Sequence, residues 1–210
     1  WVGKRAGARC ITQNDINRML VRLARPGRRV VRLKGGDPGM FGRLGEEIAA
    51  LQDAGISFAI VPGITAASAA AAASGIALTV RGSARRVQFV TAHARAGEEL
   101  HLDWPSLADP SATTVFYMAR QSAGLIAERL MAHGLGASTS VLLMSDVSYD
   151  SEMRMRVALS GLPDAVKDFP PAVPLIILIG EVTAAAAIRP RRKEQSESAA
   201  LAVAGAWGRP

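Results

Sequence analysis

The stretch VVRLKGGDP at residues 30–38 decides the fold of this chain. It reads as a buried strand that stops at two glycines, an acid and a proline. Gly35 and Gly36 let the backbone approach a ligand closely, because no Cβ stands in the way. The Asp37 carboxylate follows at once, and in an open α/β sheet ligands sit at the carboxyl ends of the strands. The stretch therefore predicts a ligand site, with a plain strand–turn–helix junction as the alternative.

Outward from this stretch, strands are followed by glycine turns and then by helices. That rhythm is typical of βαβ units, so the predicted fold class is α/β, with helices packed on a mostly parallel sheet. The predicted strands are 29–34, 57–61, 87–91, 113–118, 140–144 and 174–180, with an extended segment at 154–160. The predicted helices are 13–24, capped by Thr12, and 45–54, 65–74, 121–133 and 162–169; a long loop is predicted at 94–110. We expect domains at 1–84 and 85–188, and a disordered tail at 189–210.

The composition of the chain indicates the kind of partner it binds and the cell compartment in which it works. The formal net charge of +7 favours an acidic partner: nucleic acid, a membrane surface or a polyanionic small molecule. Cys10 is the single cysteine, so no internal disulfide forms and a reducing cytosol is expected. We see no apolar run of membrane-spanning length and no signal peptide. His93, His101 and His133 are too scattered to predict a metal site.

Four blocks of sequence carry a resemblance. They are VGKR at 2–5 with Gln13 and Ile16-Asn17, then residues 30–47, then VPGITAA at 61–67 with IALTVR at 76–81, and TAH at 91–93. In this order and at these spacings, the blocks resemble the uroporphyrinogen-III C-methyltransferases, a branch of the tetrapyrrole methylases.

The resemblance implies two α/β domains with a cofactor cleft between them, usually in a cytoplasmic homodimer. It implies S-adenosylmethionine as the cofactor and methyl transfer to two pyrrole carbons of uroporphyrinogen III, giving precorrin-2 on the branch to sirohaem and cobalamin. The implied substrate is a tetrapyrrole with eight carboxylates, which would explain why much of the excess positive charge of the chain is arginine. Neither nucleic acid nor membrane is an implied partner.

The resemblance also assigns site residues. Lys4 matches the proposed proton donor, Arg43 and Arg81 are expected to grip substrate carboxylates, and His93 is expected to hydrogen-bond substrate or to be structural. The residues expected to bind the cofactor are Gly35, Gly36, Asp37, Met40, Thr65, Ala66, Met118 and Asp146. The alternative role for Met40 and Met118 is packing in the hydrophobic core, and the alternative role for the Thr65 hydroxyl is helix capping.

The chain also departs from the family pattern. The family's opening strand and GxGPGDP loop, and an aspartate proposed as general base in a YDxLVS segment, do not occur in it. Val80, Ala92 and Gly39 replace a histidine, a glycine and an apolar residue, and Asp146 is an unexpected acid near the implied pocket. We therefore expect an N-terminally truncated enzyme with an exposed sheet edge, weak stability and poor turnover.

Two other functions stay open at this stage. One is a non-catalytic fragment or remnant that binds a tetrapyrrole or a partner chain. The other is an RNA ribose methyltransferase of the same fold. It is the weaker alternative, because an SDAGTP-like turn is absent at 34–38 and aromatic residues suited to base stacking make up only 5% of the chain.

Overall fold

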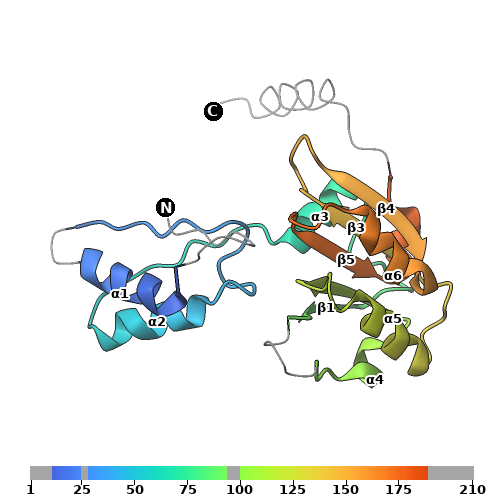
Figure 1. Cartoon of the computed structure of the whole chain (residues 1–210), viewed down its shortest axis with the longest axis horizontal. Coiled ribbons are helices and arrows are strands. Elements are labelled where there is room, and N and C mark those ends of the chain that lie inside the picture. Colours follow the sequence, from blue (N-terminus) through green and yellow to red (C-terminus); the bar gives the residue numbers. More distant parts are fainter. Residues whose placement is uncertain (1–10, 25–27, 94–99, 189–210) are drawn as a thin grey trace. The chain divides into compact units, whose positions relative to one another are not determined.

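Figure 1 shows the computed structural model of the chain, which describes residues 11–24, 28–93 and 100–188. The chain divides into two compact units, Trp1–Ala66 and Ala67–Pro210. The predicted tail at 189–210 lies outside the described residues.

The first unit contains two packed helices, α1 (Gln13–Leu23) and α2 (Leu44–Asp53). A reciprocal capping box starts α1: the Thr12 hydroxyl accepts from the Asp15 backbone N–H at 3.1 Å, and the Asp15 carboxylate accepts from Thr12. These bonds satisfy backbone donors that a helix start leaves free. Both helices confirm the predicted spans 13–24 and 45–54.

The strands predicted at 29–34 and 57–61 are wrong. Both segments are extended, but within the described part of the chain neither joins a ladder. A strand exists only when a neighbouring backbone pairs with it, and alternation in one sequence does not supply that neighbour. The two segments instead line one open groove of about 1590 Å³. Its lining includes Val31, Leu33 and Val61, which are 78%, 84% and 79% exposed.

The second unit is built on one five-stranded sheet in the order β1-β2-β5-β3-β4. Its strands are β1 (Arg86–Thr91), β2 (Ala112–Tyr117), β3 (Ser140–Ser145), β4 (Met153–Ala158) and β5 (Leu175–Ile179). They confirm the predicted strand positions.

The expectation of a mostly parallel sheet is wrong for this unit. Only β1 and β2 pair in parallel within this sheet; β2–β5, β5–β3 and β3–β4 are antiparallel. The connection 146–152 between β3 and β4 is short, and a short connection permits only a hairpin, whereas a parallel pair needs a long crossover.

Helices and short 3₁₀ turns surround this sheet. They are α3 (Ala66–Ser74), α4 (Trp104–Leu107), α5 (Ala123–Ala132), α6 (Leu162–Ala165), η1 (Leu159–Gly161), η2 (Val166–Asp168) and η3 (Glu181–Ala185). Helix α4 lies inside the predicted loop 94–110; the Asp103 carboxylate caps it by accepting from the Ser106 N–H at 3.3 Å. The helix predicted at 162–169 is divided into α6 and η2.

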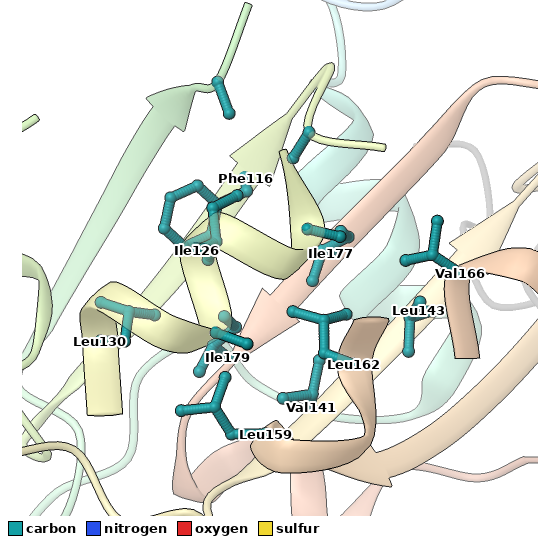
Figure 2. Packing of buried hydrophobic residues seen from close by; sticks show 14 of the residues in the cluster. Phe116, Ile126, Leu130, Val141, Leu143, Leu159, Leu162, Val166, Ile177 and Ile179 are labelled. Carbon is teal, nitrogen blue, oxygen red and sulfur yellow. The ribbon is translucent and has the colours of Figure 1, made fainter. Parts of the chain in front are cut away.

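Alternation along the strands builds a core on both faces of the sheet. Val141 and Leu143 of β3 point to the face covered by α5 and α6, where Figure 2 shows their packing. Leu142 and Met144 point to the opposite face, where the small buried side chains of α3 lie. All four strand residues have no exposed surface. The unit is therefore a three-layer α/β/α sandwich, confirming the α/β class.

The two compact units divide at residue 66, whereas a domain boundary at residue 84 was expected from the sequence. The packing of helix α3 accounts for the difference. Ala67 and Ala70 are fully buried in the cluster that covers β2, β3 and β5. The helix therefore belongs with the second unit. No helix in the described ranges combines the length and the apolar character that crossing a bilayer requires.

We predict that Leu178→Ala lowers the free energy of unfolding by about 2–5 kcal/mol, because it leaves a cavity at a fully buried position of the central strand β5. The matched control is Val61→Ala, at a 79% exposed position, with an expected change under about 0.5 kcal/mol. Urea unfolding followed by circular dichroism measures both. Equal losses for the two variants would contradict the assigned core.

Candidate functional site

The candidate site of the first unit is the turn at residues 35–37, tied to a second turn by one carboxylate. Asp37 Oδ1 accepts from the Gly39 N–H at 2.8 Å, and Oδ2 accepts from the Gly63 N–H at 3.0 Å. Gly36 has φ +71°, in the left-handed region that favours glycine. The Asp37 side chain thereby fixes its own loop and the turn after the segment 56–62.

Close packing makes glycine necessary at one position here and leaves space at another. A Cβ on Gly63 would lie 2.3 Å from the Gly36 carbonyl oxygen, so the two turns touch through their backbones. A Cβ on Gly35 would have no heavy atom of the described chain within 4 Å. Gly35 is also exposed. The turn therefore presents one open backbone edge, at Gly35.

The remaining predicted residues of this unit lie around the turn. Met40 is half-buried and donates its backbone N–H to the Asp37 carbonyl at 3.2 Å. Thr65 is half-buried and Ala66 is exposed, directly after Ile64, whose carbonyl lies 3.5 Å from a Cβ placed on Gly36. The structure thus brings residues 35–40 and 63–64 together. Thr65 and Ala66 are near this turn because they directly follow residues 63–64 in the sequence.

A buried charge cluster lies behind the turn and was missed by the sequence analysis. Glu47 is 2% exposed, and its carboxylate accepts from Gln13 Nε2 at 3.2 Å, Arg32 Nε at 3.3 Å and Lys34 Nζ at 3.2 Å. A usable signal was present: two cations, at residues 32 and 34, interrupt a segment expected to be buried. Buried charges require a partner of opposite sign.

Arg43, which was expected to bind a substrate carboxylate, forms an ion pair with Glu46. Its guanidinium donates to both Glu46 oxygens, at 2.6 Å from Nε and 2.7 Å from Nη2. This carboxylate raises the pKa of the Arg43 guanidinium. Both side chains are about half exposed, and exposed pairs contribute little stability, so a substrate carboxylate can replace Glu46 at small cost.

In the second unit, three predicted residues follow three strands at one edge of the sheet. His93, Met118 and Asp146 come just after β1, β2 and β3. Strand β1 is parallel to β2, and β2 and β3 are both antiparallel to β5, so all three carboxyl ends lie at the same edge. This is the edge where α/β sheets bind ligands.

The individual geometries at this edge differ. Met118 is 50% exposed at φ +54°, so the core alternative does not hold for it. Asp146, at φ +48°, is half-buried and accepts from the Ser151 hydroxyl at 2.7 Å. His93 is exposed. Arg81 is also exposed, in the turn closed by the Val80–Ala84 bridge.

Tyr117 is a further residue that sequence reasoning did not single out. Its hydroxyl accepts from the Ala67 N–H at 3.1 Å, which anchors the first turn of α3 to the end of β2. Its ring packs edge-to-face on Phe89, with 6.1 Å between centroids. Lys4 lies outside the described residues. Within those residues no group of three or more His, Cys, Asp or Glu side chains could hold a metal ion.

Comparison with known proteins places this geometry among related chains. Residues 2–163 match the family model described as Tetrapyrrole (Corrin/Porphyrin) Methylases. The chain is 47% identical over 182 residues to siroheme synthase 1 of Aeromonas hydrophila and 44% identical over 182 residues to the siroheme synthase of Thioalkalivibrio sulfidiphilus. These alignments cover 87% of this chain but 39% and 37% of those relatives, so the chain spans about two fifths of their length.

Solved structures of methyltransferases are also similar to this chain. The uroporphyrin-III C-methyltransferase of Thermus thermophilus, complexed with S-adenosyl homocysteine, has a TM-score of 0.71 at 34% identity, covering 88% of this chain and 77% of that one. A cobalt precorrin-4 methyltransferase of cobalamin biosynthesis has a TM-score of 0.73 at 25% identity, covering 83% and 72%.

We predict that Gly63→Ala destabilises the first unit by about 1–3 kcal/mol, because its Cβ would overlap the Gly36 carbonyl and must push the two turns apart. Hydrogen-exchange mass spectrometry over residues 35–66 measures the loss of protection. Gly124→Ala in α5 is the control, since no described atom lies within 4 Å of its Cβ position. Unchanged protection in Gly63→Ala would show that the turns do not touch.

Proposed function

The chain belongs to the tetrapyrrole (corrin/porphyrin) methylase family, and on that premise we propose that it takes part in S-adenosylmethionine-dependent C-methylation of uroporphyrinogen III. The observation that carries the proposal is the exposed, open backbone edge at Gly35 beside the half-buried Asp37 carboxylate. The Thermus thermophilus methyltransferase, a relative of similar fold, was solved with S-adenosyl homocysteine.

The residues present fit such a cofactor. An open glycine edge admits a flat or extended ligand against the backbone. A carboxylate has about four acceptor positions, and Asp37 uses one bond on each oxygen for Gly39 and Gly63. It therefore retains acceptor capacity for a ligand hydroxyl or ammonium. Met40, in the same loop, offers a polarizable thioether to apolar parts of the ligand.

In the proposed chemistry the protein positions the cofactor and the substrate, and it does not need to supply a nucleophile. S-adenosylmethionine, when bound, supplies an electrophilic methyl group on a sulfonium. The turn 35–37 would orient the nucleoside part. By family resemblance, Met118 and Asp146 are further residues for cofactor binding. Holding the two reactants in line is the main catalytic contribution expected of such a site. By family resemblance, Lys4 would donate a proton.

Substrate binding is assigned to the cationic residues. Arg43 and Arg81 are exposed and present planar guanidinium groups, which bind carboxylates in forked pairs. Arg43 would exchange Glu46 for a substrate carboxylate, and His93 would donate a hydrogen bond. A polycarboxylate tetrapyrrole suits a chain of net charge +7. We also propose a cytoplasmic homodimer that uses neither nucleic acid nor membrane as a partner.

The sharpest test of cofactor binding is Gly35→Ala. Its Cβ enters open space, so the fold should be unaffected while a ligand held against this edge is pushed away. We predict at least a tenfold loss of affinity for S-adenosylhomocysteine, about 1.4 kcal/mol, by isothermal titration calorimetry. Gly45→Ala in α2 is the matched control, because its Cβ position is equally open. It should bind like the wild type.

A methylation assay separates the rival functions. Incubation with labelled S-adenosylmethionine and uroporphyrinogen III should transfer label to the tetrapyrrole. Binding of S-adenosylhomocysteine without any transfer would favour the non-catalytic binding protein. No binding by the wild-type chain would overturn the proposed function altogether.

A further inference from the structure

We propose that Lys34, held by the buried carboxylate of Glu47, is the positioning residue for the loop 35–42 and keeps its turn in the ligand-binding conformation. This inference rests on the proposed function for the meaning of that conformation. Neither residue is assigned a contact with the ligand; both act through the backbone of the loop.

The first step is the burial of Glu47. Its side chain is 3% exposed, and that of Lys34 is 11% exposed. A buried carboxylate is costly unless opposite charge and hydrogen bonds compensate. Gln13 of α1, Arg32 and Lys34 supply those bonds to the carboxylate on α2. The ammonium of Lys34 is thereby fixed relative to both helices.

The second step is the reach of Lys34 across its own loop. Besides bonding Glu47, Lys34 Nζ donates to the carbonyl of Gly42. The chain leaves Lys34, passes through the turn 35–37 and returns to that same ammonium at Gly42. One side chain therefore closes both ends of the loop. A loop with fixed ends has few conformations left to it.

The third step is the fit of Gly42 against the lysine. A Cβ at Gly42 would lie 3.2 Å from Lys34 Cε and 2.9 Å from the Pro38 carbonyl oxygen. The backbone at Gly42 therefore lies against the lysine side chain, while the Pro38 carbonyl leaves no room for a Cβ at this position. The packing and the hydrogen bond point to the same residue.

The fourth step is the strain that the loop carries. Phe41 and Arg43 both occupy the left-handed region, at φ +53° and +56°. Non-glycine residues adopt this region at a cost and keep it only where the surroundings hold them there. Lys34 bonds Gly42, which lies between these two residues. Without that bond the strained end of the loop would relax, and the Asp37 lock at its other end would loosen with it.

The test uses Lys34→Met, which keeps the apolar stem and removes the ammonium. In the ligand-free full chain, NMR amide exchange reports on Gly39 and Gly63, both bonded to Asp37. We expect at least tenfold faster exchange at these two amides. The internal reference is the Ile56 amide in the same unit, which donates to the Leu51 carbonyl at 2.9 Å and should be unchanged.

Controls separate positioning from general stability. Lys167→Met removes a lysine whose ion pair with Asp164 is 73% and 85% exposed, and it should change nothing. If Lys34→Met does not fold, Glu47→Gln keeps the side-chain shape and should show the same pattern more weakly. Unchanged exchange at Gly39 and Gly63, or an equal rise at Ile56, would overturn the positioning role.

Affinity provides a second readout. Lys34→Met should bind S-adenosylhomocysteine about tenfold more weakly than the wild type and Lys167→Met, as measured by calorimetry. A wild-type chain that binds no S-adenosylhomocysteine would refute the proposed function, whereas the exchange experiment would still decide the role of Lys34. Faster exchange with full affinity would also overturn the proposal, since the loop would then not govern binding.

Discussion

The bridge from one carboxylate to two backbone amides is the constraint on which the candidate site depends. Asp37 bonds Gly39 in its own loop and Gly63 in a turn distant in sequence. Charge-assisted bonds of this kind are among the stronger hydrogen bonds in proteins. They hold the Gly36 carbonyl against Gly63 and leave Gly35 as the open edge. The two extended segments that lead into these turns are thus joined at their carboxyl ends.

The second unit contributes a different kind of order. Its central strands are buried on both faces, and helices cover each face. Residues that follow β1, β2 and β3 emerge at one edge of this sheet. Met118 and Asp146 both have positive φ, which is uncommon for such side chains and is often found at functional sites.

Much of this could be predicted from the sequence, for identifiable reasons. Helices end at caps and glycines, so α1 and its Thr12–Asp15 box follow from local residues. The alternating or continuous apolar runs of the second unit locate its strands. The glycines of the turn are visible because few other residues tolerate such backbone positions.

What could not be predicted depends on partners distant in the chain. Nothing local to VVRLK shows whether a neighbouring strand is present to pair with it, so the strand prediction failed at 29–34. Strand direction is likewise set by connections, and the short 146–152 link gives an antiparallel pair in a sheet that was expected to be mostly parallel. The burial of Glu47 could not be predicted locally, because its three partners come from residues 13, 32 and 34.

We propose that the open edge at Gly35, set by the Asp37 bridge, receives the nucleoside of the methyl donor. A crystal structure of the chain with S-adenosylhomocysteine tests it most directly. We expect the ligand in van der Waals contact with the Gly35 backbone, about 3.5–4.0 Å away, and hydrogen-bonded to Asp37. A ligand bound elsewhere, with Gly35 still facing solvent, would contradict it.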